Sequence, residues 1–330
     1  MPQNIQAKNP TKAPLVTVLG GLGFMGSHIC RELLRRGNRV RVFDKLYTSH
    51  ELVVDIEHDL EIVEGDMSRS SDVVSVIADA ETLIHLIHTT RPGSSMEDPA
   101  FDISSNVEAN ASWLMHLNKT SVRQIMFVSS GGTVYGNPQT IPIDENHPTN
   151  PVCSYGIAKL AIEKYIAMYA SMYGLDYCLL RPSNVYGEGQ RLNVGQGIIG
   201  VLADRALRGE NLEIWGTGEN LRDYLHVDDL VSALMALLSY RGPHRAFNIA
   251  SSEGRSVVEI VSLLTDYLKM RPEVVYKPDR GFDVPANVLD SSRLREETGW
   301  QPKVDLSAGI ARTVDWVRSR LANEACELHL

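Results

Sequence analysis

Short apolar runs alternate with amphipathic segments through the first half of the chain. The runs span residues 15–19, 39–43, 61–63, 82–86 and 125–129. Runs of this length are typical of strands buried on both faces of a parallel sheet. The segment after the first run places Ile29, Leu33 and Leu34 at helical spacing. Alternating strands and helices predict an α/β fold whose parallel sheet is covered by helices on both faces.

A glycine-rich turn follows the first predicted strand directly. Gly20, Gly23 and Gly26 stand three residues apart, and the second predicted strand ends in Asp44, 18 residues after Gly26. Glycines placed in this way let the backbone turn tightly and approach a pyrophosphate at the helix N-terminus. An acid near this distance is typical of one that binds a ribose diol. The pattern predicts a dinucleotide-binding unit. The spacing is Gly-x-x-Gly-x-x-Gly, and a purely structural turn is the alternative.

Asp44 also bears on which dinucleotide is bound. A carboxylate that faces the ribose accepts hydrogen bonds from a free diol and repels a 2′-phosphate. This favours NAD over NADP, although the neighbouring Lys45 weakens the inference.

A serine pair and a tyrosine–lysine pair form the candidate catalytic group. Ser129 and Ser130 lie at the end of the run 125–129, and Tyr155 precedes Lys159 by four residues. This spacing places both side chains on one face of a helix, although alone it is more often a solvated face. A nearby ammonium stabilises a phenolate and lowers the pKa of the tyrosine. We therefore expect Tyr155 to exchange a proton with a substrate hydroxyl near neutral pH, with a serine sharing that proton.

Together, these motifs resemble the extended short-chain dehydrogenase/reductases, and among them the nucleotide-sugar epimerase/dehydratase family. The resemblance runs from about residue 15 to residue 316 and includes the glycine turn, Tyr155 and Lys159. It implies a Rossmann-type doubly wound parallel sheet with a smaller C-terminal substrate-binding lobe. It also implies NAD as the cofactor and a nucleotide sugar as the substrate, with UDP the most frequent nucleotide in the family.

The resemblance further implies roles for individual residues. The cofactor is expected at Gly20, Gly23, Phe24, Met25, Gly26, Asp44, Asp66, Met67, Leu86, Tyr155 and Lys159. The substrate is expected at Thr90, Ser130, Tyr155, Asn184, Arg222, Arg280 and Asp283. The planar guanidinium of Arg222 suits diphosphate oxygens, and a surface ion pair with Asp223 or Glu219 is the alternative. Asn106, expected to begin a helix that reaches residue 118, is implied to order the catalytic region.

The chain departs from the family pattern just after the serine pair. Gly131 stands where many relatives have serine or threonine, and Gly132 and Thr133 stand where some have an acidic pair. Ser130 is therefore the expected catalytic hydroxyl, with Ser129 in reserve. Dehydration is disfavoured, because it needs a proton donor and a base that Gly132 and Thr133 do not supply.

His88 marks a second departure. The family usually has small residues after the run 82–86, so the contacts around the nicotinamide ribose stay open here. His88 is a candidate acid or base, but the sequence shows no partner for it, and a structural role is favoured. Cys153, two residues before Tyr155, is expected to be a packed thiol.

Composition narrows the partners and the compartment. The chain has 330 residues, of which 43% are hydrophobic, and a net charge of −9. The acidic balance argues against nucleic acid and anionic membranes as partners, and no apolar stretch reaches the roughly 18 residues of a membrane span. The four cysteines show no metal-ligand or disulfide spacing. We therefore expect no metal and a reducing, cytoplasmic compartment.

The chain is expected to divide unevenly. Residues 1–14 read as a loose polar tail without a signal peptide. Residues 15–181 are the expected NAD-binding Rossmann domain and 182–330 mainly the substrate-binding lobe, interleaved across an approximate boundary. A homodimer is expected through the helices that start near Asn106 and Tyr155. Four apolar residues are candidates for that contact, although they could equally belong to the core: Tyr165, Met168, Tyr169 and Met172.

The sequence thus predicts an NAD-dependent nucleotide-sugar epimerase that inverts C4 of a UDP-hexose or UDP-N-acetylhexosamine through a transient 4-keto sugar. In this family such enzymes usually supply sugars for a cell-surface polysaccharide. The alternative is a reductase or dehydrogenase of the same family with net use of nicotinamide. A non-enzymatic NAD-sensing regulator is disfavoured because Tyr155 and Lys159 are both present. Asn287 stands where some hexose epimerases have tyrosine, which leaves room beside C2 for an N-acetyl group.

Overall fold

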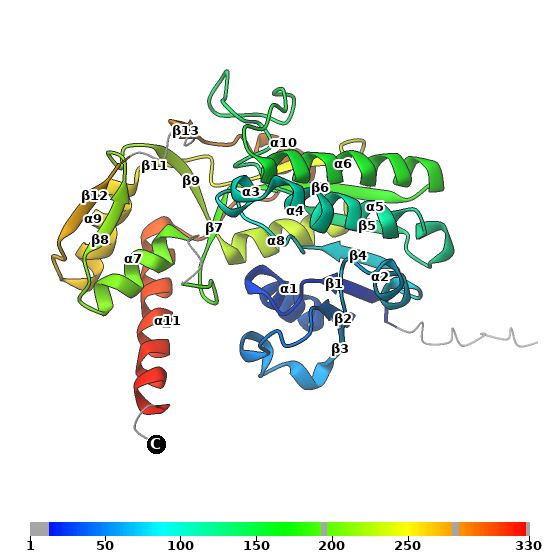
Figure 1. The fold of residues 1–330 in the computed structure, drawn as a ribbon, viewed down its shortest axis with the longest axis horizontal. Helices are drawn as coiled ribbons and strands as arrows, with labels where there is room; N and C mark the ends of the chain where they lie inside the picture. The colour runs from blue at the N-terminus through cyan, green and yellow to red at the C-terminus, as the bar shows by residue number, and fades with distance from the viewer. Residues whose placement is uncertain (1–12, 193–196, 279–283, 328–330) are drawn as a thin grey trace, which may run out of the picture.

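The computed structural model describes residues 13–192, 197–278 and 284–327. A large α/β lobe contains most of the first half of the chain, and a smaller lobe built around α11 (Leu306–Glu327) lies beside it (Figure 1). The strand order of the central sheet in the large lobe determines where a ligand of such a fold can bind.

That sheet has seven strands in the spatial order β3-β2-β1-β4-β5-β6-β10, and all neighbours pair in parallel. The strands are β1 (Leu15–Leu19), β2 (Arg39–Asp44), β3 (Leu60–Glu64), β4 (Thr82–His85), β5 (Gln124–Val128), β6 (Asp176–Pro182) and β10 (Ala246–Ile249). The chain order reverses between β1 and β4, and ligands of such sheets bind beyond the carboxyl ends of the strands at this switch point. The predicted Rossmann-type doubly wound sheet is confirmed.

Helices cover both faces of the sheet. The cores on the two sides explain why β1 is apolar without alternation: Val16 and Val18 belong to one core, and Leu15 and Leu19 to the other. The first core includes α1 (Phe24–Arg35), α8 (Val227–Leu238) and α10 (Ser292–Thr298). The second includes α2 (Ser70–Ile77), α5 (Ala109–Leu114) and α6 (Ser154–Tyr173).

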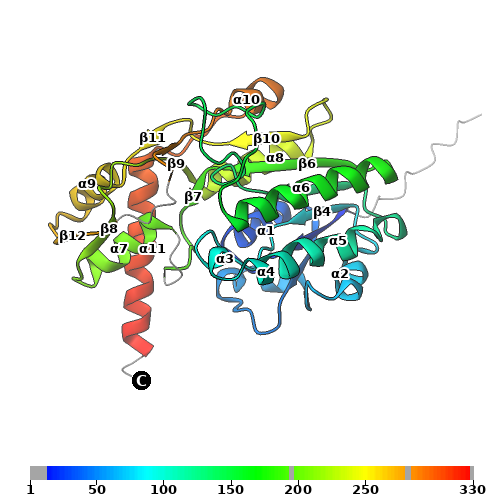
Figure 2. The same cartoon turned by 45° about the horizontal axis from the view of Figure 1, so that its top comes forward.

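The segment between β4 and α5 differs from the prediction. The helix expected to begin at Asn106 begins earlier, because Asp98 caps Phe101 N and Pro99 occupies the first helical position. It then widens into a π-helical stretch, a feature frequent at functional sites. The elements are α3 (Ser94–Glu97), α4 (Pro99–Asp102) and η3 (Ile103–Glu108), and all three lie beside α6 (Figures 1 and 2). Asn106 is buried in that stretch.

The smaller lobe has its own core and two small sheets. Strand β9 (Leu221–His226) pairs with β7 (Asn184–Tyr186), β11 (Gly254–Arg255) and β13 (Ala286–Asn287). Strand β8 (Leu212–Trp215) pairs with β12 (Val274–Lys277), and α7 (Ile198–Leu207), α9 (Val257–Leu268) and α11 pack around them. The remaining short helices are η1 (Glu51–Val53), η2 (Glu57–Asp59) and η4 (Leu117–Lys119). Since α8, β10 and α10 return to the large lobe, no single position divides the chain cleanly.

A buried ionic network ties α6 to the sheet. Arg181 on β6 donates to both carboxylate oxygens of Glu163 on α6, from Nε at 3.0 Å and from Nη2 at 2.6 Å. Its Nη1 donates to the hydroxyl of Tyr135 at 3.0 Å, and that hydroxyl donates to Asn248 Oδ1 on β10 at 2.7 Å. Glu163 and Arg181 are 1% and 6% exposed, so neither charge has water as an alternative partner.

Removing one half of this ion pair should be more harmful than removing both. We expect Arg181→Met to lower the free energy of unfolding by about 3–5 kcal/mol, because it leaves the Glu163 carboxylate charged and buried. The double variant Arg181→Met/Glu163→Leu should lose less. Denaturant unfolding of the two variants and the wild type measures this. A double variant at least as unstable as the single one would contradict the account.

Candidate active site

The glycine turn lies at the switch point of the sheet. Gly20 has φ +90°, and a Cβ at Gly26 would lie 2.1 Å from the carbonyl oxygen of Gly20, so neither position tolerates a side chain. Gly23 is the N-cap of α1 and provides no capping side chain. A Cβ at Gly20 would lie 3.2 Å from Ile87, which places the turn against the end of β4. Without side chains in the way, a dinucleotide pyrophosphate can come close to the backbone of this turn and to the first turn of α1.

The carboxylate of Asp44 lies beside this turn. Its Oδ2 accepts a hydrogen bond from Leu22 N at 3.2 Å, and its Oδ1 accepts from Lys45 N at 3.0 Å and Thr48 Oγ1 at 3.2 Å. These contacts hold the carboxylate at the end of β2, where the sequence predicted a ribose ligand. Further around the same edge, Asp66 is exposed and Met67 is buried.

The other predicted cofactor residues line the same region. Phe24 and Met25 are the first residues of α1, and Leu86 follows β4 with a half-buried side chain. All of these positions lie near the edge where the strands of the parallel sheet end, which is where such sheets bind their ligands.

Tyr155 and Lys159 lie on one face of the first turns of α6. Lys159 is 2% exposed, and its Nζ donates to the carbonyl oxygen of Val128 at 2.9 Å. The same nitrogen is 5.8 Å from the ring centroid of Tyr155 and 4.9 Å from that of Phe127. Burial lowers the pKa of Lys159 to about 7, and the charge of Glu163 opposes that shift. The lysine is therefore able to change its charge near neutral pH.

The pKa of Tyr155 is raised in this structure, whereas the sequence predicted that Lys159 would lower it. Burial raises the pKa of Tyr155, and electrostatic interactions with Cys153 and Asp102 act in the same direction. The physical reason is geometric: Lys159 directs its Nζ at Val128 O, and the tyrosine ring packs edge to face on His88 at 4.5 Å between centroids. In the protein alone, the phenol therefore keeps its proton.

The two serines differ clearly in their surroundings. Ser129 is 4% exposed and donates from Oγ to Glu163 Oε1 at 2.5 Å, so it belongs to the buried ionic network. Ser130 is half-buried, and its Oγ lies 3.9 Å from where a Cβ at Gly132 would be. Ser130 is thus the hydroxyl of the pair that lies closer to the surface, which supports the predicted choice.

The predicted substrate residues are partly described. Asn184 on β7 is exposed, and its Nδ2 donates to Asp223 O at 3.1 Å. Arg222 on β9 is half-buried and donates from Nη1 to Leu221 O at 2.9 Å. Asp223 itself is buried and accepts from Ser251 and Ser252. Arg280 and Asp283 lie outside the described residues.

Asn287 lies close to the position that lacks the usual serine. Its side chain is 2% exposed, and Nδ2 donates to Gly131 O at 3.4 Å. The amide therefore faces the glycine pair that follows Ser130.

A hydrogen-bond network around Asp102 was missed by the sequence reasoning. Asp102 Oδ2 accepts from Ser154 Oγ at 2.7 Å, and Oδ1 accepts from Asn106 Nδ2 at 3.0 Å and from Thr90 Oγ1. His88 Nε2 lies 3.6 Å from Oδ1. Thr90, predicted to contact the substrate, thus directs its hydroxyl at a carboxylate. Nothing in the sequence marks Asp102, because only the packing of α4 under α6 brings these groups together.

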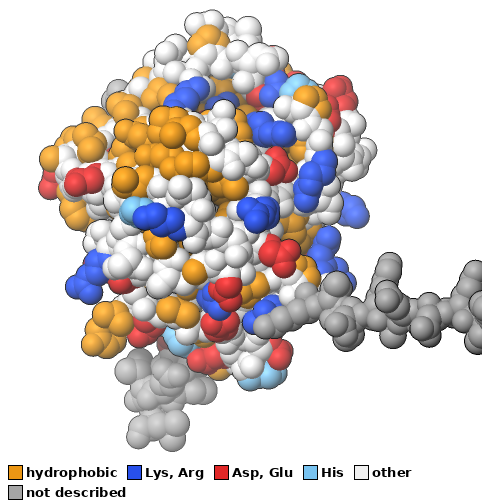
Figure 3. Space-filling view, turned by 90° about the vertical axis from the view of Figure 1, so that its right-hand side faces the viewer, with side chains coloured by type: hydrophobic (Ala, Val, Ile, Leu, Met, Phe, Trp, Pro, Cys, Tyr) orange, Lys and Arg blue, Asp and Glu red, His pale blue; other side chains and the backbone are white. Residues whose placement is uncertain are grey.

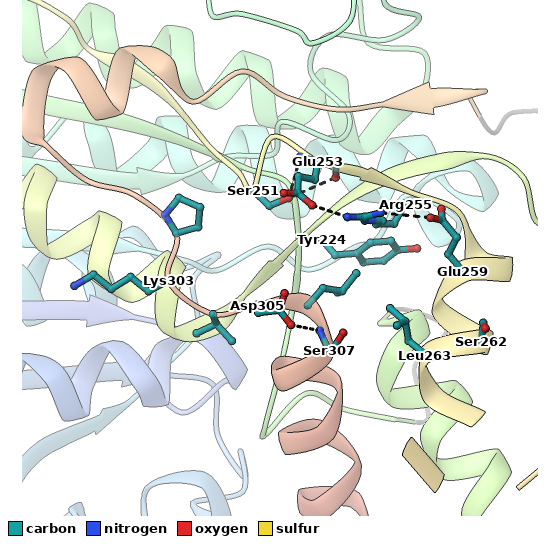
Figure 4. A pocket seen from close by; sticks show the side chains of 13 residues that line it. Tyr224, Ser251, Glu253, Arg255, Glu259, Ser262, Leu263, Lys303, Asp305 and Ser307 are labelled. Atoms are coloured by element: carbon teal, nitrogen blue, oxygen red, sulfur yellow. Dashed lines mark hydrogen bonds and ion pairs between the residues drawn. The ribbon is translucent and has the colours of Figure 1, made fainter. Parts of the chain in front are cut away.

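A cavity of about 510 Å³ lies in the smaller lobe, and Ser251, which donates to Asp223, is one of the residues that line it. Tyr224, Arg255, Lys303 and the start of α11 line it (Figure 4). Arg255 is paired there with Glu253 and Glu259.

The described residues include no cluster of three or more His, Cys, Asp or Glu side chains arranged to hold a metal ion. Nor is any described helix both long and apolar enough to cross a membrane.

Known proteins resemble this chain over almost its entire length. Residues 16–250 match the NAD dependent epimerase/dehydratase family. The UDP-glucose 4-epimerase of Mycolicibacterium smegmatis is 32% identical over 308 residues, covering 92% of this chain and 98% of the relative. The structure of UDP-glucose 4-epimerase from Thermotoga maritima with UDP-glucose has a TM-score of 0.87 at 34% identity, covering 93% of this chain and 99% of that chain. A UDP-N-acetylglucosamine 4-epimerase from Methanobrevibacter ruminantium has a TM-score of 0.87 at 27% identity, covering 94% and 100%.

Burying Lys159 should weaken the fold in a pH-dependent way. Its folded-state pKa of about 7 lies below the usual 10.5, so the unfolded chain binds more protons between these values and stability rises with pH there. We expect Lys159→Met to raise Tm at pH 7 and to raise it less at pH 10. Thermal unfolding at both values tests this, with Lys164→Met, an exposed lysine of the same helix, as the control. If the Tm of Lys159→Met at pH 7 is unchanged or lower, burial of Lys159 does not destabilise the fold.

Proposed function

Because the chain belongs to the NAD-dependent epimerase/dehydratase family, we propose that it is a UDP-hexose 4-epimerase that uses NAD. The observation that carries the proposal is the placement of Tyr155 and Lys159 on one face of α6, beside the serine pair at the end of β5. The glycine turn and Asp44 lie along the same edge of the sheet. This arrangement brings an acid–base group to the place where a dinucleotide would be held.

The residues divide the work between binding and proton transfer. When bound, NAD supplies a nicotinamide ring that removes a hydride from a sugar carbon and returns it. The glycine turn and Asp44 would hold its pyrophosphate and ribose, as their geometry allows. Tyr155 would take the proton of the 4-hydroxyl as the 4-keto sugar forms and give it back afterwards, with Ser130 sharing the hydrogen bond. When Lys159 is protonated, its positive charge would lower the free-energy cost of ionising Tyr155.

Two features favour epimerisation over the other reactions of the family. Gly132 and Thr133 provide no carboxylic acid for expelling a hydroxyl, and the Thr133 Oγ1 is buried without a hydrogen-bond partner among the described residues. A dehydratase would need such an acid. Asp44 favours NAD over NADP, whereas a reductase would more naturally draw on NADPH.

The substrate assignment rests on similarity and on one position. The relatives named above include enzymes for UDP-glucose and for UDP-N-acetylglucosamine. Asn287 is smaller than the tyrosine of some hexose epimerases and packs on Gly131, which supports room for an N-acetyl group beside C2. We therefore propose that UDP-hexoses and UDP-N-acetylhexosamines both react, in cytoplasmic supply of sugars for a polysaccharide.

A second copy of this chain is the proposed partner. The face of the molecule in Figure 3 carries a broad hydrophobic area. Exposed apolar side chains lie on α6 and on the neighbouring α4 and η3, namely Ile157, Tyr165, Met168, Met172, Phe101 and Ile103. Tyr169, also expected there, is partly buried against the second core. Such a patch supports association through α6, since monomers rarely expose contiguous apolar area without a function.

Substitutions at the proton-exchange site test the mechanism. We expect Tyr155→Phe to lower kcat for UDP-glucose and UDP-galactose interconversion by at least about a hundredfold. Ser130→Ala should lower kcat at nearly unchanged Tm, because its hydroxyl acts on the substrate. Ser129→Ala should instead lower Tm, because Glu163 loses a buried donor. A near-normal rate for Tyr155→Phe, or the reverse pattern for the two serines, would contradict these assignments.

A further inference from the structure

Asp102 is a buried carboxylate for which the proposed reaction has no use. Its side chain is 0% exposed and lies at the end of α4. Burial alone would raise its pKa, but His88, Ser154 and Thr90 hold the pKa at about 2. The group is therefore charged at neutral pH, and a charge kept in the interior needs partners that remain in place.

The two oxygens of Asp102 join two segments of the site. Oδ1 accepts from Thr90 and from Asn106 Nδ2, both on the stretch that leads from β4 into η3. Oδ2 accepts from Ser154 Oγ at 2.7 Å. Ser154 begins α6 and directly precedes Tyr155, whose backbone N donates to Ser95 Oγ at 3.0 Å. The carboxylate thus fixes the helix turn that carries the tyrosine.

His88 connects the same carboxylate to the tyrosine ring. Its side chain is 5% exposed, with Nε2 3.6 Å from Asp102 Oδ1, a contact longer than a hydrogen bond. The imidazole meets the ring of Tyr155 edge to face, at 4.5 Å between centroids and 70° between planes. Burial lowers the pKa of His88 to about 4, so the ring is neutral. Neither ring nitrogen has a hydrogen-bond partner within the described part of the chain. Its contacts are therefore the edge-to-face packing on Tyr155 and the approach of Nε2 to Asp102, which helps to lower the pKa of that carboxyl.

We propose that Asp102 and His88 are positioning residues for Tyr155, Asp102 by anchoring the start of α6 and His88 by packing against the phenol ring. The inference rests on the proposed function, which makes Tyr155 the group that exchanges the proton. It explains why a bulky histidine stands where relatives usually have small residues. It also makes a charged carboxylate part of the electrostatic surroundings of the phenol.

Because Asp102 is charged, its effect on Tyr155 can also be measured without turnover, through the pKa of the tyrosine. The titratable groups around Tyr155 are Cys153, Lys159, His88 and Asp102. Of these, Asp102 is the carboxylate, and its negative charge raises the pKa of Tyr155. Replacing it by Asn removes that charge with little change in shape, so the pKa of Tyr155 should fall.

The experiment combines that titration with kinetics. The pKa of Tyr155 is read from tyrosinate absorbance, as the difference between each protein and its Tyr155→Phe counterpart. For Asp102→Asn we expect this pKa to fall by about one unit, and kcat on UDP-glucose to fall about tenfold with KM within threefold. His88→Ala should lower kcat similarly, and His88→Phe should restore most of it because the ring contact returns.

Two further variants separate positioning from general destabilisation. His147→Ala is the matched control, since His147 is also buried and meets a tyrosine ring, that of Tyr135, edge to face. It should lower Tm without moving the pKa of Tyr155. Ser154→Ala keeps the charge of Asp102 but removes its hydrogen bond to the start of α6. We therefore expect kcat to fall while the pKa of Tyr155 stays unchanged. This variant also replaces Asp102→Asn if that protein does not fold.

An unchanged kcat in both Asp102→Asn and Ser154→Ala would overturn the proposal. So would a kcat loss in the His88 variants that only follows Tm, as in His147→Ala. If the wild type converts no UDP-sugar, the proposed function fails while the titration still decides whether Asp102 acts on Tyr155.

Discussion

The ammonium of Lys159 is buried at the carboxyl end of β5, and much of the site is organised around holding it there. Its Nζ has the carbonyl of Val128 as an acceptor and two aromatic rings nearby. A cation in such surroundings is costly unless opposite charge lies close. Glu163, one turn further along α6, provides that charge and is itself neutralised by Arg181 on β6. The carboxylate and the guanidinium therefore act as one unit that locks α6 onto the sheet, and the carboxylate partly offsets the cost of burying the lysine.

Locking α6 in this way fixes the tyrosine relative to the sheet edge. The switch point between β1 and β4 defines where a dinucleotide can lie, and α6 presents Tyr155 beside the end of β5. The second anchor comes from Asp102, which ties the start of α6 to the stretch after β4. Because both anchors are buried charges with several partners, the phenol has little freedom to move. That rigidity suits a reaction in which one group must remove and return a proton at a single carbon.

The sequence predicted the parts of this design that depend on local pattern. The apolar run of β1, the glycine turn and the acid at the end of β2 follow from periodicity and turn chemistry, and the structure has them in place. The Tyr155–Lys159 pair followed from helical spacing. Two predictions failed for different reasons. The helix before Asn106 starts earlier because of a local cap, Asp98 followed by Pro99, that the sequence reasoning did not use. The pKa of Tyr155 is raised by burial, which depends on long-range packing. His88 and Asp102 stand 14 residues apart, and no local pattern shows that they meet.

The proposed function requires the chain to invert a sugar carbon without net oxidation. The most direct test is to incubate the purified protein with UDP-glucose without added cofactor and follow the anomeric proton signals. A galacto-configured signal should grow while no free NADH accumulates. No conversion of UDP-glucose or UDP-N-acetylglucosamine even after NAD is added, or product formed only with stoichiometric use of nicotinamide, would contradict it.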